Sequence, residues 1–212
     1  MSALLVMLLP AAADPVRLPK GLRPVVADTG APGRFAAWRQ EKGLPAAELA
    51  CEPALPGAVL LCFRVWEGDL RRWVTRDDLA RWGATTGDVR DALLPEARRR
   101  IASAEEVPIE GTTSSYLRLA DGDGWAASAV LAPVALATRL GEMSVRIALP
   151  AEGVLLAWRT GDAERDRIMA VGARETYDAQ PGSVSPAMFT WDGHVWTKFG
   201  EALLVTGRPP SR

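Results

Sequence analysis

Apolar residues run together or alternate with polar ones in seven short stretches of the chain, which is the pattern of β-strands. Short turns rich in Gly and Asp join most of these stretches in pairs, so they predict β-hairpins. The last pair is joined by Asp192-Gly193, a sequence typical of a two-residue hairpin turn. The expected strands are residues 58–66, 70–74, 115–119, 145–149, 154–158, 187–191 and 194–199.

Helices are expected between the strand pairs. Thr75 and Thr85 each stand three residues before an aspartate, a spacing that resembles a capping box at a helix start. The helix after Thr85 carries one apolar stripe of residues spaced four apart: Val89, Leu93, Ala97 and Ile101. The expected helices are residues 34–42, 75–83, 85–103, 125–140 and 163–179.

The order of these elements predicts an α+β fold with a mainly antiparallel sheet, built from hairpins, and helices packed on one face. We expect this domain to span residues 58–206. Residues 14–57 are rich in Pro and Gly as far as Gly33, so they predict an extended, loosely tethered arm with one short helix. Residues 207–212 predict a frayed tail.

The N-terminus predicts an exported protein. Residues 3–9 form an apolar run, Pro10 ends it, and three alanines follow, as in a signal peptide over residues 1–13 cleaved after Ala13. The positive charge that usually precedes such a run is missing. The alternative is an apolar N-terminal strand that packs into the core.

The two cysteines bear on the same question. Cys51 and Cys62 flank a turn that contains Pro53, Pro56 and Gly57, so the chain can double back and bring them together. In an exported protein such a pair predicts a disulfide. The alternative is two unrelated buried thiols, and separated cysteines would favour a cytoplasmic protein with a wrongly read N-terminus.

Composition narrows the function classes. Of 212 residues, 48% are hydrophobic and 24% are charged, which is ordinary for a globular protein. The 25 basic and 26 acidic residues give a net charge of −1, whereas nucleic-acid binders carry a clear positive excess. We therefore expect no nucleic-acid partner. The apolar segment 125–140 is too short to span a bilayer, so no transmembrane segment is expected in the mature chain.

Five stretches carry a family resemblance: Trp73-Val-Thr-Arg-Asp-Asp-Leu79, Tyr116-Leu-Arg-Leu-Ala-Asp-Gly-Asp-Gly124, Val145-Arg-Ile-Ala-Leu-Pro150, Val154-Leu-Leu156 and Met188-Phe-Thr-Trp-Asp-Gly193. On these, residues 70–199 resemble the C-terminal part of the YtpQ-like family of bacterial proteins of unknown function. The resemblance supports the fold and supplies no catalytic residue. The chain departs from the family in its shorter N-terminal region and in Gly153, where the family tends to have an acidic residue.

Residues able to carry out catalysis are scarce. His194 is the only histidine, no Gly-x-Ser-x-Gly elbow occurs, and both glycine-rich phosphate motifs are missing. The turn around Asp121 and Asp123 lacks the further acidic ligands that calcium needs. We therefore expect no catalytic residue, no metal and no cofactor.

The last hairpin comes closest to a binding site. A two-residue turn would pair Trp191 with His194 and Phe189 with Trp196 on one face. We expect Phe189 and Trp196 to be buried, and Trp191 and His194 to be exposed candidates for binding.

The favoured function is that of a non-enzymatic binding or interaction protein of the cell envelope or extracellular space, with an unknown protein or small-molecule partner. The alternative is a hydrolase that depends on carboxylates. It requires acids from distant segments, such as Glu142, Glu152 and Asp192, to converge in one cleft.

Overall fold

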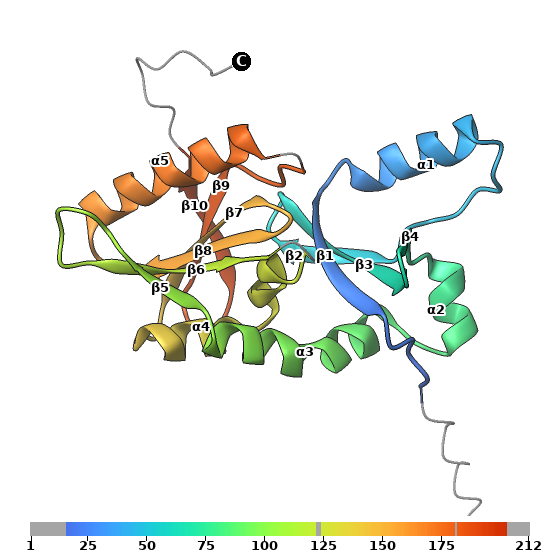
Figure 1. Cartoon of the computed structure of the whole chain (residues 1–212), viewed down its shortest axis with the longest axis horizontal. Helices are drawn as coiled ribbons and strands as arrows, with labels where there is room; N and C mark the ends of the chain where they lie inside the picture. Colours follow the sequence, from blue (N-terminus) through green and yellow to red (C-terminus); the bar gives the residue numbers. More distant parts are fainter. Residues whose placement is uncertain (1–15, 122–123, 181, 203–212) are drawn as a thin grey trace, which may run out of the picture.

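The computed structural model describes residues 16–121, 124–180 and 182–202, and its strands form two antiparallel sheets (Figure 1). In the smaller sheet, β3 is central: β1 pairs with one edge, and β2 and β4 share the other edge. The bounds of these strands are β1 Leu22–Asp28, β2 Cys51–Leu55, β3 Val59–Glu67 and β4 Leu70–Trp73.

The larger sheet has six strands in the order β10-β9-β7-β8-β6-β5, and every neighbouring pair is antiparallel. Its strands are β5 Glu105–Pro108, β6 Ser115–Ala120, β7 Val145–Ala151, β8 Val154–Arg159, β9 Ala187–Trp191 and β10 Trp196–Glu201. The hairpins β3–β4 and β7–β8 and the pairing of β9 with β10 confirm most of the strands expected from the apolar pattern.

Helices lie on both sides of each sheet. They are α1 Ala31–Glu41, α2 Arg76–Trp82, α3 Thr86–Ala102, the 3-10 helix η1 Ala126–Leu131, α4 Pro133–Leu140 and α5 Ala163–Ala179. Both expected capping boxes are present, at Thr75 and Thr85. The α3 stripe is buried along its whole length, as expected.

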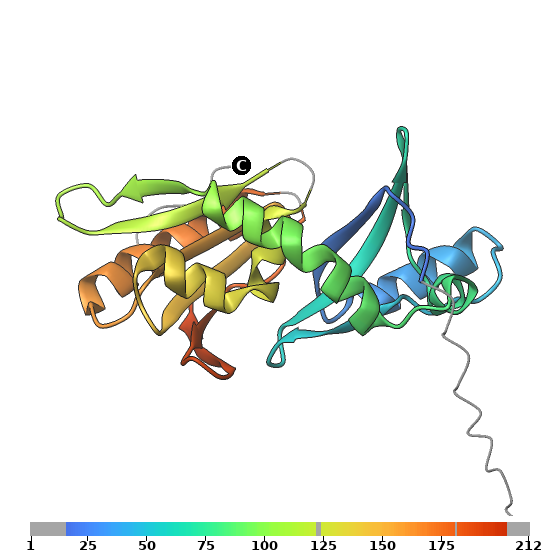
Figure 2. The same cartoon turned by 90° about the horizontal axis from the view of Figure 1, so that it is seen from below.

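The long helix α3 joins the two halves of the molecule. It runs beneath both sheets (Figure 1), and the view from below shows it crossing from one to the other (Figure 2). Its N-terminal half packs with β3 and α2 in one apolar cluster, through Val89 and Leu93. Its C-terminal residue Ile101 belongs to the cluster formed by η1, α4 and one face of the larger sheet.

The α+β class and the antiparallel hairpins are confirmed, but the layering differs from the expectation. The strands form two sheets, and α5 covers the face of the larger sheet opposite to α4, through Met169, Ala170 and Ala173. The reason lies in β7 and β8, where successive residues are buried instead of alternating ones. A strand with both faces buried has an uninterrupted apolar sequence.

The expected loosely tethered arm over residues 14–57 is wrong where β1 and β2 lie, whereas its expected short helix is present as α1. β1 is buried and paired with β3 along seven residues, although Pro24 interrupts it. The N–H of Trp66 donates to the Gly21 carbonyl, which fixes the register so that Pro24 falls at a position pointing away from β3. Proline is tolerated there because no ladder hydrogen bond is lost.

Two further boundaries differ. The expected buried helix over residues 125–140 is buried but divided, because Pro133 has no N–H to continue η1 and instead begins α4. The expected signal peptide over residues 1–13 and the tail over 207–212 lie outside the described residues.

Candidate ligand-binding site

The last hairpin does not have the expected register. Trp191 pairs with Trp196, so four residues separate the strands instead of two. The Asp192 carboxylate shapes this loop by accepting hydrogen bonds from the backbone N–H groups of His194 and Val195, both at 2.9 Å. These hydrogen bonds, of which the one from Val195 has the larger effect, hold the pKa of Asp192 below its usual range. Sequence reasoning missed this because an Asp side chain can replace the backbone bonds of a tighter turn.

The observed register changes which aromatic side chains of the last hairpin lie together. Phe189 is fully buried in the core, as expected, whereas Trp191 and Trp196 are both half-buried and contact each other with ring centroids 5.6 Å apart. His194 is exposed on the loop and does not pair with Trp191. The observed register therefore does not place the two binding candidates, Trp191 and His194, opposite each other.

The carboxylates proposed for a hydrolase do not converge. Glu142 precedes β7 and Glu152 follows it, so they lie at opposite ends of a strand about 20 Å long at ~3.3 Å per residue. Asp192 lies at the Glu142 end, because its neighbour Trp191 pairs with Val145. Glu142 and Glu152 are each engaged by an arginine, Arg159 and Arg64 respectively.

A cleft of about 1040 Å³ lies on the face of the smaller sheet away from α3. Its lining comes from α1 and the loop that follows it, which we call one wall, and from β4 and the start of α2, which we call the other. Figure 1 shows where these elements lie. The turn after β7 and residues 182–184 close one end. We call this space the α1 cleft.

The floor of the α1 cleft is apolar and includes small residues. Ala27 of β1 and Ala31 of α1 pack with Cys62 of β3, and the half-buried Trp73 lies against them. Cys51 and Cys62 face each other across β2 and β3 and form the expected disulfide. This bond ties β2 to the central strand beneath the cleft. Because the two alanines are short, the floor leaves room above it.

Arginine and tryptophan alternate across β3 and β4 beside this floor. Arg64 is paired with Trp73, and Trp66 is paired with Arg71, so the four side chains share one face of the hairpin. The Arg64 guanidinium lies 3.9 Å from the centroid of the Trp73 ring, and that of Arg71 lies 4.0 Å from Trp66. Both are cation–π contacts, which hold the planar guanidinium groups in place.

The charged lining is mostly arginine. Six arginines and four carboxylates line the cleft, and three of the carboxylates are engaged in ion pairs within it. Asp28 pairs with Arg34, Asp78 with Arg72 and more loosely with Arg81, and Glu152 with Arg64 at 2.6 Å. The hydrogen bond from Arg34 holds the pKa of Asp28 below its usual range, although partial burial opposes it.

Burial and neighbouring charges act in different balance on Asp78 and Arg64. Burial acts to raise the pKa of Asp78, but hydrogen bonds from Thr75 and the neighbouring Arg72 outweigh it and keep this pKa low. For Arg64, burial lowers the pKa and the Arg71 charge acts in the same direction, against the attraction of Glu152. Two guanidinium groups thus lie near enough to repel each other.

Arg39 and Arg71 differ from the other four arginines. Within the part of the chain that the structure describes, neither makes an ion pair; Arg39 donates from Nε to the Pro45 carbonyl and lies over Phe35, 5.6 Å from its centroid. Arg39 belongs to α1 and Arg71 to β4, so one stands on each wall. Among the described residues, the cleft therefore presents an arginine without an ion-pair partner on both sides of an apolar floor, together with the exposed carboxylate of Asp77 at the start of α2.

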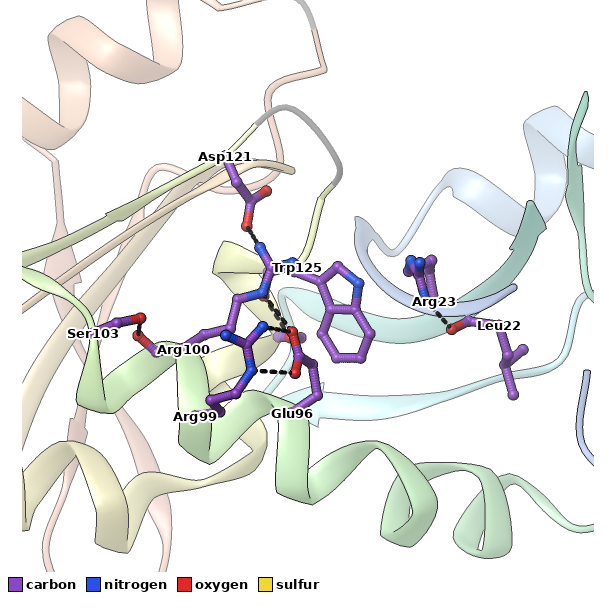
Figure 3. A network of polar contacts seen from close by, with 9 residues as sticks. Leu22, Arg23, Glu96, Arg99, Arg100, Ser103, Asp121 and Trp125 are labelled. Atoms are coloured by element: carbon purple, nitrogen blue, oxygen red, sulfur yellow. Dashed lines mark hydrogen bonds and ion pairs between the residues drawn. The ribbon is translucent and has the colours of Figure 1, made fainter. Parts of the chain in front are cut away.

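A second cluster, shown in Figure 3, links the halves of the molecule. Arg100 of α3 reaches Glu96 and Asp121, each at 2.9 Å, and its guanidinium lies 5.5 Å from the Trp125 ring, with Arg23 5.6 Å from the same ring. A space of about 490 Å³ adjoins it. Because its carboxylates already hold Arg100, we assign this cluster to the packing of α3.

Sequence reasoning missed the α1 cleft. Its residues come from α1, β1, β3, β4 and α2 and from the turns of the other sheet, so nothing in the sequence joins them. The one local signal was the alternation in Arg64-Val-Trp66 and Arg71-Arg-Trp73, which places each Arg and Trp on a common face of a hairpin.

Comparisons of the chain with family models, with curated proteins and with solved structures found no match. The resemblance to the YtpQ-like family therefore stays a prediction. Among the described residues, no three His, Cys, Asp or Glu side chains are grouped as a metal site would require. No described helix is both long and apolar enough to cross a membrane.

Proposed function

We propose that the protein is a non-enzymatic binding protein of the cell envelope or extracellular space, and that it binds its partner in the α1 cleft. The observation that carries this proposal is the lining of the cleft: an apolar floor between two walls that each bear an arginine with no carboxylate partner among the described residues. A volume of about 1040 Å³ is just above the range for small-molecule sites, about 300–1,000 Å³.

The envelope part of the proposal is supported by the disulfide, because such bonds persist in oxidising compartments. It also predicts that the mature chain begins at or near Asp14, which N-terminal sequencing of envelope or secreted material would test. An intact Met1 on protein from a cytosolic fraction would contradict export and leave the cleft proposal standing.

The binding test compares two tryptophan variants. Ala47→Trp places an indole in the cleft, because Ala47 is a half-buried loop residue of its lining. Ala36→Trp adds the same side chain at an exposed position of α1 outside that lining and serves as the matched control. Each protein is incubated with detergent-solubilised envelope of the native host, re-isolated and examined by mass spectrometry.

We expect a compound that the wild type and Ala36→Trp retain and Ala47→Trp loses, with unchanged circular dichroism in all three. Equal retention by Ala47→Trp, or no retained compound, would contradict binding in the cleft. Recovery of the retained compound in a chemically altered form would contradict a non-enzymatic role.

A further inference from the structure

We propose that the ligand of the α1 cleft is an organic anion with an apolar body, whose acid group lies between Arg39 and Arg71 and whose body rests on the floor at Ala27, Ala31 and Trp73. This inference rests on the proposed function and adds the chemical class of the ligand.

Charge is the first argument. The cleft has two more arginines than carboxylates. Arg34 pairs with Asp28, Arg64 with Glu152, and Arg72 and Arg81 share Asp78, whereas among the described residues no ion pair is formed by Arg39, Arg71 or the lining carboxylate Asp77. Whereas the chain as a whole carries a net charge of −1, this one surface is positive. A concave positive surface beside apolar walls raises the local concentration of anions.

The geometry of the arginines is the second argument. The Arg71 guanidinium lies over the Trp66 ring and that of Arg39 over the Phe35 ring, so each is in contact with an aromatic ring. Because these side chains are already held, less side-chain entropy is lost when they bind an acid group. The planar guanidinium matches the two oxygens of a carboxylate, or of a phosphate or sulfonate group.

The floor supplies the third argument, which separates this ligand from a simple inorganic anion. Ala27 and Ala31 are buried and small, Trp73 is half-buried, and the rim bears the exposed apolar side chains of Trp38 and Leu70. An inorganic ion would leave these surfaces in contact with water. An apolar body would cover them, and removing this apolar area from water favours binding.

The probe for this proposal is anilinonaphthalene sulfonate, an aromatic anion that fluoresces more strongly in apolar surroundings. Phenylnaphthylamine has a similar ring body without the acid group and is the neutral comparison. The variants are Arg39→Gln, Arg71→Gln, the double variant, and Ala47→Trp. Arg98→Gln is the matched control, because Arg98 is an exposed arginine of α3 that lines neither described pocket.

We expect the wild type and Arg98→Gln to bind the sulfonate more tightly than the neutral amine. Each cleft arginine removed should weaken sulfonate binding about tenfold, since a hydrogen bond to a charged group contributes about 1.5 kcal/mol or more and 1.4 kcal/mol is a factor of ten. Decanoate should displace the sulfonate, whereas inorganic phosphate and decanol at the same concentration should not. A higher salt concentration should weaken binding of the sulfonate and leave binding of the amine unchanged.

Two outcomes would overturn the inference in different ways. If the amine binds as tightly as the sulfonate and the arginine variants change nothing, while Ala47→Trp weakens both probes, the cleft is a binding site but not for anions. If Ala47→Trp changes neither probe, the cleft is not the site and the proposed function fails with the inference. Displacement by inorganic phosphate alone would contradict the need for an apolar body.

Discussion

Replacement of Phe189 by alanine should cost far more stability than replacement of Trp196, although tryptophan is larger. Phe189 is fully buried between the larger sheet and the α4 layer, whereas Trp196 is half-buried on the edge strand β10. Removing a buried phenylalanine leaves a cavity as well as lost apolar burial, and such changes cost about 3–5 kcal/mol. For Trp196→Ala we expect about 1–2 kcal/mol, within the ordinary range for partly exposed sites.

The same hairpin offers a test of the register itself. Trp191 and Trp196 are in ring contact, so a double-mutant cycle to alanine should give a coupling energy of about 0.5–1.5 kcal/mol. The matched cycle of Trp191 with His194 should give a coupling near zero, because His194 lies on the loop.

Urea unfolding followed by far-ultraviolet circular dichroism measures all of these variants without relying on tryptophan fluorescence, which two of the substitutions alter. Equal losses for Phe189→Ala and Trp196→Ala would refute the assignment of the buried face. Coupling between Trp191 and His194 with none between Trp191 and Trp196 would refute the four-residue loop and restore the two-residue turn.

Three further predictions follow from the described contacts. Replacing Cys51 and Cys62 together by serine should lower the free energy of unfolding by about 3 kcal/mol in the same urea assay, which is the chain-entropy value for a loop of this size. Two free thiols in the unreduced, unfolded wild type would contradict the disulfide. A hydrogen bond from Arg99, opposed by burial and aided by Arg100, lowers the pKa of Glu96 to about 2 from 4.5. Its stabilising effect is therefore complete above pH 4.5 and is lost as the pH falls toward 2, so Glu96→Gln should show a smaller loss of stability over that window than the wild type. Thr85→Ala removes the capping hydroxyl of α3 and should lower the free energy of unfolding by about 1 kcal/mol. Thr86→Ala, one residue inside the helix, is its control, and equal effects of the two changes would show that the cap contributes nothing specific.

The sequence predicted the apolar strands well and the polar or proline-containing strands poorly. β3, β7 and β8 are long apolar runs and were predicted within two residues. β5 consists of Glu105, Glu106, Val107 and Pro108 and lies at a sheet edge with little burial, so it had no apolar signal. β1 and β2 each contain a proline, which normally argues against a strand, and only the register shows why Pro24 is tolerated.

The candidate site was less accessible to sequence reasoning than the fold. The disulfide could be predicted, because the turn between Cys51 and Cys62 is local. The α1 cleft could not, since its two arginines without carboxylate partners lie 32 positions apart and become opposite walls only when α1 is placed over the smaller sheet. The sequence also does not show which arginines form ion pairs with carboxylates. Such pairs join distant residues, as Arg64 and Glu152 do across 88 positions.

The indole N–H signals of the tryptophans test most directly where the protein binds. In a nitrogen–proton correlation spectrum, assigned by single Trp→Phe variants, anilinonaphthalene sulfonate is titrated into the wild-type protein. If the α1 cleft is the site, the signals of Trp38 and Trp73, which line it, should shift with one common affinity, and those of Trp191 and Trp196 should stay in place. Shifts of Trp191 and Trp196 with none at Trp38 and Trp73 would place binding at the last hairpin and contradict the account.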